Sequence, residues 1–195
     1  SKRSLDVVAS ILVIAVLSPL MLVSALAVRF TSRGPVIYKQ VRVGRSGNTF
    51  TMFKFRTMHT QADSQVKGLR EKNEHSGPMF KLANDPRITK IGKFLRRWSI
   101  DETPQLFNVL GGSMSLVGPR PHPLDDVDRY ETKAFRRLAL KPGMTGLWQV
   151  NGRSELSWEQ ALQLDLHYVE KWSLESDLFL LARTVKAVIR GSGAF

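Results

Sequence analysis

Asp101 and Glu102 are neighbouring carboxylates in the stretch WSIDETPQLF of a chain that is otherwise strongly basic. Such a pair can be the chemical centre of an enzyme whose basic groups serve it. It can also belong to the first turn of a helix, where free backbone N–H groups stabilise each carboxylate by about 0.3–1 kcal/mol. The dipeptide alone therefore favours a structural role, and its chemistry depends on its surroundings.

Basic side chains occur where they can serve these carboxylates or a phosphate. Lys54 and Arg56 alternate with phenylalanines on a predicted strand, so both cations share one of its faces. Arg120 stands between two prolines in SMSLVGPRP, which holds its backbone extended and suits bidentate contact with a phosphate. A solvated strand face remains the alternative for Lys54 and Arg56.

The overall charge indicates an anionic partner. The 195 residues include 29 Lys and Arg against 17 Asp and Glu, for a net charge of +12. Nucleic acid, anionic lipid and phosphorylated substrates all fit this excess. The absence of cysteine excludes a thiolate nucleophile and disulfides. The chain also lacks the glycine-rich loops of the common nucleotide folds, the serine elbow of hydrolases and zinc-type histidine spacing.

An uncharged stretch, Val7–Val28, indicates a membrane helix. As a helix it is long enough to span a bilayer core of about 30 Å. Basic residues flank both ends, and because positive charge marks the cytoplasmic side, both ends point to the same face. Pro19 removes one backbone hydrogen bond near the middle, where Ser18 can satisfy a freed group. The stretch therefore predicts either a helix that enters and returns or a kinked spanning helix.

The following residues predict a small hairpin and a polar connection. The stretches VIYKQVRVG and TFTMFKFRTM read as two strands joined by a turn at residues 44–48. The polar residues 59–86 are expected to form a connection or lid.

Helices are predicted for the remainder. Residues 87–97 form a basic amphipathic helix of the kind that lies on a membrane surface. Ser99 and Glu102 have the spacing of a capping box, which predicts a helix over 101–110. Further helices are expected over 125–140, 157–172 and 176–190, the second opened by a capping box of Ser157 and Gln160. The fold class is therefore α+β, mostly helical.

Four stretches, in order, resemble the bacterial sugar transferase family, the monotopic phosphoglycosyl transferases that act on polyprenol phosphates. They are KRSLDVVASILVIAVLSPLMLV, GPVIYKQVRVGRSGNTFTMFKFRTM, DPRITKIGKFLRRWSIDETPQLFNVLGGSMSLVGPRP and KPGMTGLWQVNGRS. The resemblance implies a re-entrant membrane helix over residues 1–31, broken at Ser18–Pro19. It also implies that residues 32–195 form a cytosolic, membrane-associated catalytic domain with interfacial helices, at the cytoplasmic face of the bacterial inner membrane.

The resemblance also implies an activity. Members transfer a sugar-1-phosphate from a UDP-sugar to undecaprenyl phosphate with release of UMP, as the first membrane step of exopolysaccharide, capsule or O-antigen assembly. Asp101 would be the nucleophile of a covalent, ping-pong reaction, and Glu102 would assist it, both residues holding Mg²⁺. Phosphate or substrate contacts are expected from Lys54, Arg56, Arg96, Arg120, Gln149 and Arg153.

Two alternatives remain open. In one, the lipid phosphate attacks the same donor directly, and Asp101 and Glu102 are metal ligands only. In the other, the chain is a non-catalytic membrane protein that binds anionic lipid or nucleic acid. Because no nucleic-acid-binding motif is present, inner-membrane lipids are expected as partners and nucleic acid is not. The stretch HPLDDVDRYE favours glucose or galactose as the sugar, while homo-oligomerisation and the completeness of the chain are left open.

Overall fold

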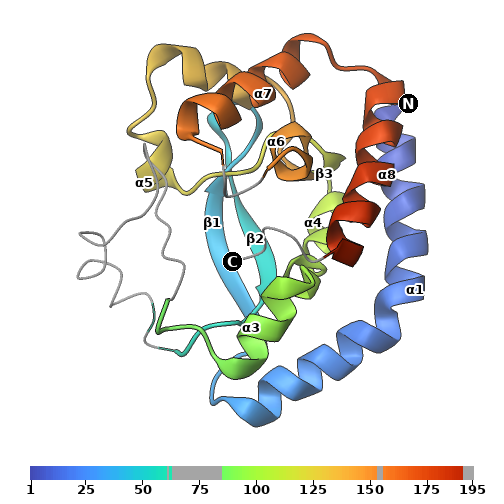
Figure 1. Ribbon diagram of the computed structural model, residues 1–195, viewed down its shortest axis with the longest axis vertical. Coiled ribbons are helices and arrows are strands. Elements are labelled where there is room, and N and C mark those ends of the chain that lie inside the picture. Colours follow the sequence, from blue (N-terminus) through green and yellow to red (C-terminus); the bar gives the residue numbers. More distant parts are fainter. Residues whose placement is uncertain (61, 63–84, 153–155, 191–195) are drawn as a thin grey trace.

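The computed structural model describes residues 1–60, 62, 85–152 and 156–190 (Figure 1). The predicted connection over 59–86 lies mostly outside these residues, and Arg153 lies outside them entirely. Within them the fold is mostly helical with a small sheet component, as expected. The α-helices are α1 Lys2–Thr31, α3 Lys90–Arg97, α4 Gln105–Leu110, α5 Leu124–Val127, α6 Leu147–Val150, α7 Trp158–Glu170 and α8 Leu174–Arg190. The strands and 3₁₀ helices are β1 Ile37–Val43, β2 Thr49–Phe55, β3 Ser115–Val117, β4 Gly143–Thr145, η1 Arg45–Gly47, η3 Ile100–Glu102 and η4 Thr132–Ala139.

The predicted hairpin is confirmed. Strands β1 and β2 pair antiparallel, with Lys54 opposite Tyr38, and they run through the middle of the molecule (Figure 1). Their turn is closed by a hydrogen bond from the amide of Gly44 to the carbonyl of Asn48 at 2.8 Å. Gly47 has a φ of 83°, a conformation that glycine adopts without strain.

Helix α1 continues through Pro19 and bends visibly along its length (Figure 1). The bend stays within one helix because the hydroxyl of Ser18 donates to the carbonyl of Ala15 at 2.9 Å, the acceptor that proline leaves without its usual N–H partner. Its buried residues are Asp6, Ser10, Ser24 and Val28. Its exposed large apolar residues are Val8, Ile11, Leu12, Val13, Val16, Leu20, Leu22, Val23, Leu26 and Phe30. By length and composition α1 is able to cross a membrane.

The first turn of α1 is docked on the body of the protein. Lys2 donates to the carbonyl of Val117 at 3.0 Å and pairs with Asp177 of α8. Arg3 donates to the last carbonyls of α4, and Asp6 accepts from the amide of Leu116 at 2.9 Å. These three side chains thus bind β3, α4 and α8. From the sequence alone, the basic residues at this end had served only as a signal of membrane topology.

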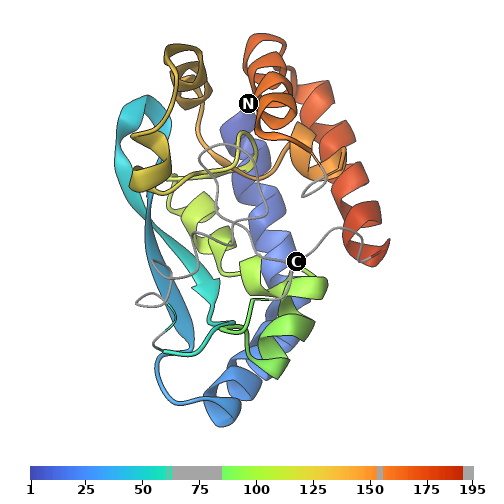
Figure 2. The same cartoon turned by 60° about the vertical axis from the view of Figure 1, so that its left-hand side comes forward.

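The last turn of α1 is docked on the same body. Val28 is fully buried against Phe55, Leu95 and Ile100. Figures 1 and 2 show α1 following the body past α4 and α3, so that both of its ends rest on the domain that contains the hairpin. A bent apolar helix is therefore fastened at both ends to a single body.

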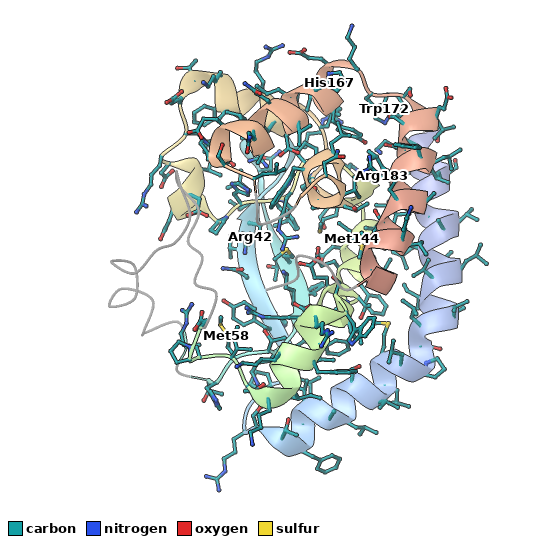
Figure 3. All side chains as sticks on the ribbon, viewed as in Figure 1. Arg42, Met58, Met144, His167, Trp172 and Arg183 are labelled. Atoms are coloured by element: carbon teal, nitrogen blue, oxygen red, sulfur yellow. The ribbon has the colours of Figure 1, made fainter. Side chains whose placement is uncertain are left out.

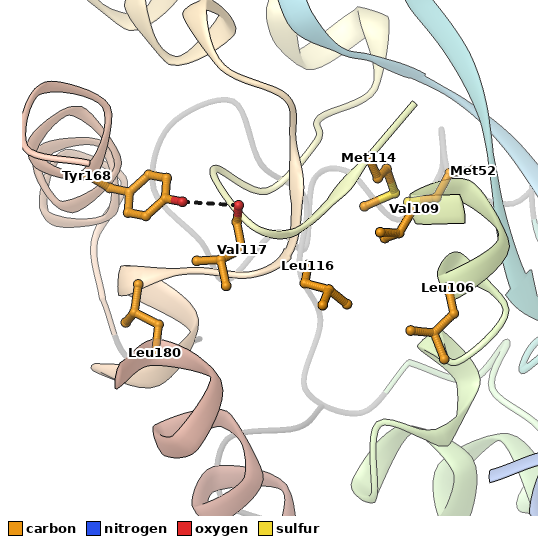
Figure 4. Close-up of a cluster of buried hydrophobic side chains, with 8 residues drawn as sticks. All are labelled: Met52, Leu106, Val109, Met114, Leu116, Val117, Tyr168 and Leu180. Atoms are coloured by element: carbon orange, nitrogen blue, oxygen red, sulfur yellow. Dashed lines mark hydrogen bonds between the residues drawn. The ribbon is translucent and has the colours of Figure 1, made fainter. Parts of the chain in front are cut away.

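The largest core cluster lies between the hairpin, α4, the β3 strand and the two last helices (Figure 4). Its buried members are Met52, Leu106, Val109, Met114, Leu116, Val117, Tyr168 and Leu180. The hydroxyl of Tyr168 donates to the carbonyl of Val117 at 3.1 Å, so the one polar group in the cluster has a partner.

Two parts of the fold differ from the sequence-based expectation. The helix predicted over 125–140 is instead the short α5 followed by η4, because Glu131 is extended between them and lets Arg137 turn inward to the buried Asp165. The short strands β3 and β4, which pair in parallel, were not predicted. Gly118 and Gly143 permit this pairing, since a Cβ on Gly143 would lie 2.1 Å from the backbone nitrogen of Gly118. The predicted capping box of Ser157 and Gln160 at the start of α7 is confirmed.

Candidate active site

A left-handed residue presents the two carboxylates. Ser99, just after α3, has φ 54° and ψ 22° and lets the chain turn sharply into η3. Its hydroxyl makes no capping bond, so the capping box predicted there is wrong. The helix predicted over 101–110 begins only at Gln105, because η3 and Pro104 come first. Asp101 and Glu102 therefore lie on a tight 3₁₀ turn between two helices.

Helix α3 is seated against the end of the hairpin by a close contact. A Cβ on Gly92 would lie 2.1 Å from the carbonyl oxygen of Thr57, and that oxygen also accepts the Thr89 amide at 2.9 Å. Thr89 caps α3 through its side chain, so the helix starts at Lys90. The sequence had predicted a start at residue 87. Phe94 of α3 and Trp98, the residue just after the helix, are both exposed.

Asp101 is buried, and its carboxylate has no hydrogen-bond or ion-pair partner among the residues that the structure describes. Burial raises the pKa of Asp101 above its usual value, and the neighbouring charge of Glu102 adds to the rise. The cations Lys54, Arg96 and Arg120 act in the opposite direction. Both oxygens of Asp101 are thus available to an incoming group, in a cationic setting.

Glu102 differs from its neighbour because two cations bind it directly. Its Oε1 accepts from Lys54 Nζ at 2.8 Å and from Arg120 Nη2 at 2.7 Å. Burial would raise the pKa of Glu102, but Arg120 and Lys54 outweigh this effect and hold that pKa well below its usual value. Burial lowers the pKa of Lys54, while Glu102 raises the pKa of Arg120. The pair is therefore divided into an uncommitted carboxylate and a cation-bound one.

The other predicted site residues occupy different places. Arg96 donates from Nε to the hydroxyl of Thr57 at 2.9 Å and interacts electrostatically with Asp101. Arg56 follows the end of β2 and donates to the carbonyl of Ser32 at 2.8 Å, at the connection between α1 and β1. Gln149 is buried on α6. The structure thus brings Lys54, Arg96 and Arg120 to the carboxylates and places Arg56 at the end of α1.

The backbone of the Pro-Arg-Pro stretch is held from several sides. Arg137 donates to the carbonyl of Arg120 at 3.1 Å, and Arg42 donates to the carbonyl of Pro121 at 3.1 Å. The carbonyl of His122 accepts the amide of Val43 at 3.0 Å. These bonds fix Arg120 against the hairpin that bears Lys54.

Asn108 is a positioning residue that sequence reasoning missed. Its side-chain amide donates to the carbonyl of Thr51 at 2.7 Å and accepts from the amide of Phe53 at 3.0 Å. The side chain thus makes the pair of hydrogen bonds that a neighbouring strand would make with the edge of β2. These bonds fasten β2 to α4. An asparagine directly after an apolar pair in a helix is a weak signal, and only the tertiary structure shows its use.

Replacing Asn108 with Ala is expected to lower the free energy of unfolding by about 2–3 kcal/mol, because two partly buried backbone groups lose their partners. Sugar-phosphate transfer should fall with it as Lys54 loses its fixed position. Asn151→Ala is the matched control, since the exposed Asn151 bonds a single helix carbonyl, at 2.8 Å, among the described residues and its removal should cost about 0.5 kcal/mol or less. Chemical denaturation of both variants measures the difference, and equal losses would contradict the role of Asn108.

The site and the fold together define a class of protein. An uncommitted carboxylate beside a cation-bound one, surrounded by basic side chains, is suited to a reaction at a phosphate group. The exposed apolar surface of α1 is suited to contact with a membrane. These features are typical of an enzyme that transfers phosphate-containing groups at a bilayer surface.

Comparison with known proteins agrees with this class. The family model of the bacterial sugar transferases matches residues 1–191, and the chain belongs to this family. The galactosyl transferase CpsE of Streptococcus agalactiae is 49% identical over 162 residues, covering 83% of this chain and 36% of its own. The undecaprenyl-phosphate galactose phosphotransferase of Salmonella typhimurium is 44% identical over all of this chain and 41% of its own length.

A third relative matches along most of its length. The exopolysaccharide production protein ExoY of Sinorhizobium fredii is 41% identical over 199 residues, which cover all of this chain and 88% of ExoY. The chain thus spans about two fifths of the first two relatives, at 36% and 41%, and most of the third.

Proposed function

We propose that this chain transfers a sugar-1-phosphate from a UDP-sugar to undecaprenyl phosphate, with release of UMP and through a covalent intermediate on Asp101. The observation that supports the proposal best is the difference between the two carboxylates. Asp101 has uncommitted oxygens, while Glu102 is bound by Lys54 and Arg120. The names of the Salmonella and ExoY relatives indicate the substrate class and the polysaccharide pathway.

The reaction divides into two displacements at one phosphorus. In the first, an Asp101 oxygen forms a bond to the β-phosphorus, and the bond to the bridging oxygen breaks. That oxygen keeps the electron pair and leaves on UMP. In the second, an oxygen of the lipid phosphate bonds to the same phosphorus, the Asp101 oxygen–phosphorus bond breaks, and the carboxylate is regenerated. No proton transfer is needed, because a carboxylate and a phosphate both attack as anions.

The protein's cations lower the repulsion between Asp101 and the anionic donor. Lys54 and Arg120 are held on Glu102, so they are oriented before the substrate arrives and need little reorganisation. Arg96 adds a third positive charge that interacts with Asp101. The tight turn at Ser99 keeps the attacking oxygen near these groups, and a single small site can serve the soluble donor and the lipid acceptor in turn.

Mg²⁺ fits the oxygens that the carboxylates leave available. Asp101 has both oxygens uncommitted among the described residues, and the ion pairs of Glu102 use Oε1. Mg²⁺ is commonly bound through one or two carboxylates together with substrate phosphates, and no cluster of three or more ligating side chains occurs among the described residues. When bound, the ion would neutralise charge on the pyrophosphate.

Trapping the intermediate tests the covalent route. The wild-type chain is incubated with UDP-sugar labelled in the β-phosphate and without acceptor, using UDP-galactose and UDP-glucose in parallel. Label is expected on the denatured protein, and it should be released when undecaprenyl phosphate is added before denaturation. Turnover without any labelled protein would favour the alternative of direct attack by the lipid phosphate. If no donor yields UMP at all, the non-catalytic alternative gains support.

We further propose that α1 enters the cytoplasmic face of the inner membrane and returns to it. Both of its ends dock on the same body, through Lys2 and Val28, and a helix that crossed the bilayer would place one end on the far side. Its exposed apolar residues would face lipid along the bend. Basic residues at both ends agree with a shared cytoplasmic side.

Cysteine labelling of this cysteine-free chain tests the re-entrant geometry. Ser1→Cys and Arg33→Cys are placed at the two exposed ends of α1. Both cysteines should react with an impermeant maleimide in inside-out vesicles, and neither should react in intact spheroplasts. Val16→Cys, at a residue that is 77% exposed on the bent segment, is expected to be protected in both preparations by lipid. Labelling of the two ends from opposite sides would show instead that α1 spans the bilayer.

A further inference from the structure

Arg42 is a cation beside the candidate site for which the reaction described above has no role. It lies on β1, near the middle of the molecule in Figure 3, and its side chain is partly buried. None of the ion pairs among the described residues includes Arg42. Asp126 and Glu102 interact with its charge electrostatically, but neither makes an ion pair with it among the described residues.

The guanidinium of Arg42 is fixed in place but not fully used. Nε and Nη2 donate to the side-chain oxygen of Gln40 at 3.1 and 2.6 Å, and Nη1 donates to the carbonyl of Pro121 at 3.1 Å. An arginine has one N–H on Nε and two on each terminal nitrogen. One N–H on Nη1 and one on Nη2 are thus left over, and this pair is the fork that binds two oxygens of a phosphate.

A second guanidinium is held close to the first. Arg42 bonds the residue that follows Arg120, and the charge of Arg120, together with burial as the larger cause, lowers the pKa of Arg42 to about 10. Glu102 pairs with Arg120 but not with Arg42, so the two guanidinium groups still repel each other and an anion between them would lower that cost. The arrangement is therefore suited to an anionic ligand.

The order of the charges indicates which phosphate this ligand is. Glu102, the neighbour of Asp101, accepts from Arg120 at 2.7 Å, and Pro121, the neighbour of Arg120, accepts from Arg42 at 3.1 Å. Along this chain of contacts Arg120 lies between the carboxylates and Arg42. A phosphorus within reach of Asp101 is therefore closest to Lys54 and Arg120, and the next phosphate of the donor falls on the side of Arg42.

We propose that Arg42 and Arg120 bind the phosphate of the departing nucleoside monophosphate. The inference rests on the proposed function for the identity of the nucleotide. As the bond between the β-phosphorus and the bridging oxygen breaks, that oxygen takes the electron pair and becomes part of the UMP phosphate. The fork of Arg42 then stabilises the negative charge that the leaving group gains.

Calorimetric titration of the full chain in detergent with UMP tests the proposal. Arg42→Met should weaken UMP binding by roughly 10- to 100-fold, since it removes charge-assisted hydrogen bonds. Arg42→Lys keeps a donor for the Pro121 carbonyl and should weaken it by roughly 3- to 10-fold, which covers the case in which the Met variant does not fold. Arg45→Met, at an exposed arginine of the hairpin turn, is the matched control and should change UMP affinity less than about twofold.

Titration with uridine and assays with the lipid acceptor separate a phosphate contact of Arg42 from a contact with the nucleoside or the lipid. Uridine has no phosphate, so its affinity should be the same in the wild type and in the Arg42 variants. The proposal is overturned if UMP affinity is unchanged in both variants, if uridine affinity falls as far as UMP affinity, or if only the KM for undecaprenyl phosphate rises. If the wild type traps labelled sugar phosphate but the Arg42 variants bind UMP as tightly as the wild type, the proposed function stands and only the Arg42 subsite is refuted. Wild type that transfers nothing would refute the proposed function even if Arg42→Met weakens UMP binding.

Discussion

Asp101→Asn is expected to lower the rate of UMP release by at least about a thousandfold, because the amide has the shape of the carboxylate but is not a nucleophile. The fold should persist, since the Asp101 carboxylate accepts no hydrogen bond within the described part of the chain. Removing a buried charge should leave the melting temperature unchanged or slightly raised. Asp128→Asn, at an exposed aspartate, is the control and should keep full activity.

The raised pKa of Asp101 gives this prediction a pH dependence. Asp101 must be ionised to attack, so kcat/KM for the UDP-sugar should rise with pH through a pKa that lies above the ordinary 3.8. Because the folded state holds this proton more tightly than the unfolded chain, Asp101 stabilises the fold below that pKa and costs stability above it. A variant Asp101→Asn that keeps a tenth of wild-type activity would contradict the assignment of Asp101 as nucleophile.

Glu102→Gln should destabilise the protein and slow transfer together. The substitution leaves Lys54 and Arg120 as unpaired cations in a mostly buried site. A fully buried pair broken in this way costs about 3–5 kcal/mol, and partial exposure of these side chains reduces our expectation to about 2–3 kcal/mol. Adding Lys54→Met removes one of the two unpaired charges and should restore part of the stability but none of the activity. Urea denaturation of the two single variants and the double variant measures this coupling.

A surface pair of the same chemistry provides the control. Glu170 accepts from Arg136 at 2.7 Å, the same distance as the Glu102–Arg120 pair, but its side chain is 45% exposed. Glu170→Gln should change the free energy of unfolding by about 0.5 kcal/mol or less. Equal effects of the two substitutions would refute the special role of Glu102.

The pH dependence of Glu102 has the opposite sign to that of Asp101. Its folded pKa lies below the ordinary 4.5, so its stabilising effect is complete above 4.5 and is lost as the pH falls towards the folded value. The free energy of unfolding of the wild type should therefore fall in that acidic range. The difference between the wild type and Glu102→Gln should shrink there, because the variant never has this stabilisation.

Local signals in the sequence predicted the elements whose formation depends on residues close by in the sequence. The alternating strands of the hairpin, the long apolar helix and the capping box of Ser157 all appear where they were expected. Lys54 and Arg120 were predicted from their own segments, and the structure brings them to one oxygen of Glu102. Each of these features is determined by periodicity or by a few adjacent side chains.

Features that depend on distant partners could not be predicted in the same way. The spacing of Ser99 and Glu102 fits a capping box, but the turn from α3 into η3 requires the left-handed conformation of Ser99. Arg56 shares the alternation of Lys54, yet β2 ends before it, and the backbone at Ser32 takes its donors. Asn108 gains its role only once β2 lies beside α4. In each case tertiary contact overrides a local pattern.

The contact between Lys2 and Asp177 joins an early turn of the chain to its last described helix. During synthesis α1 leaves the ribosome well before α8, so Lys2 is made long before its acidic partner. The acidic end of the contact arrives only when α8 has been made. The contacts of this turn with Val117 and with the end of α4 therefore become possible earlier in translation than the ion pair with Asp177.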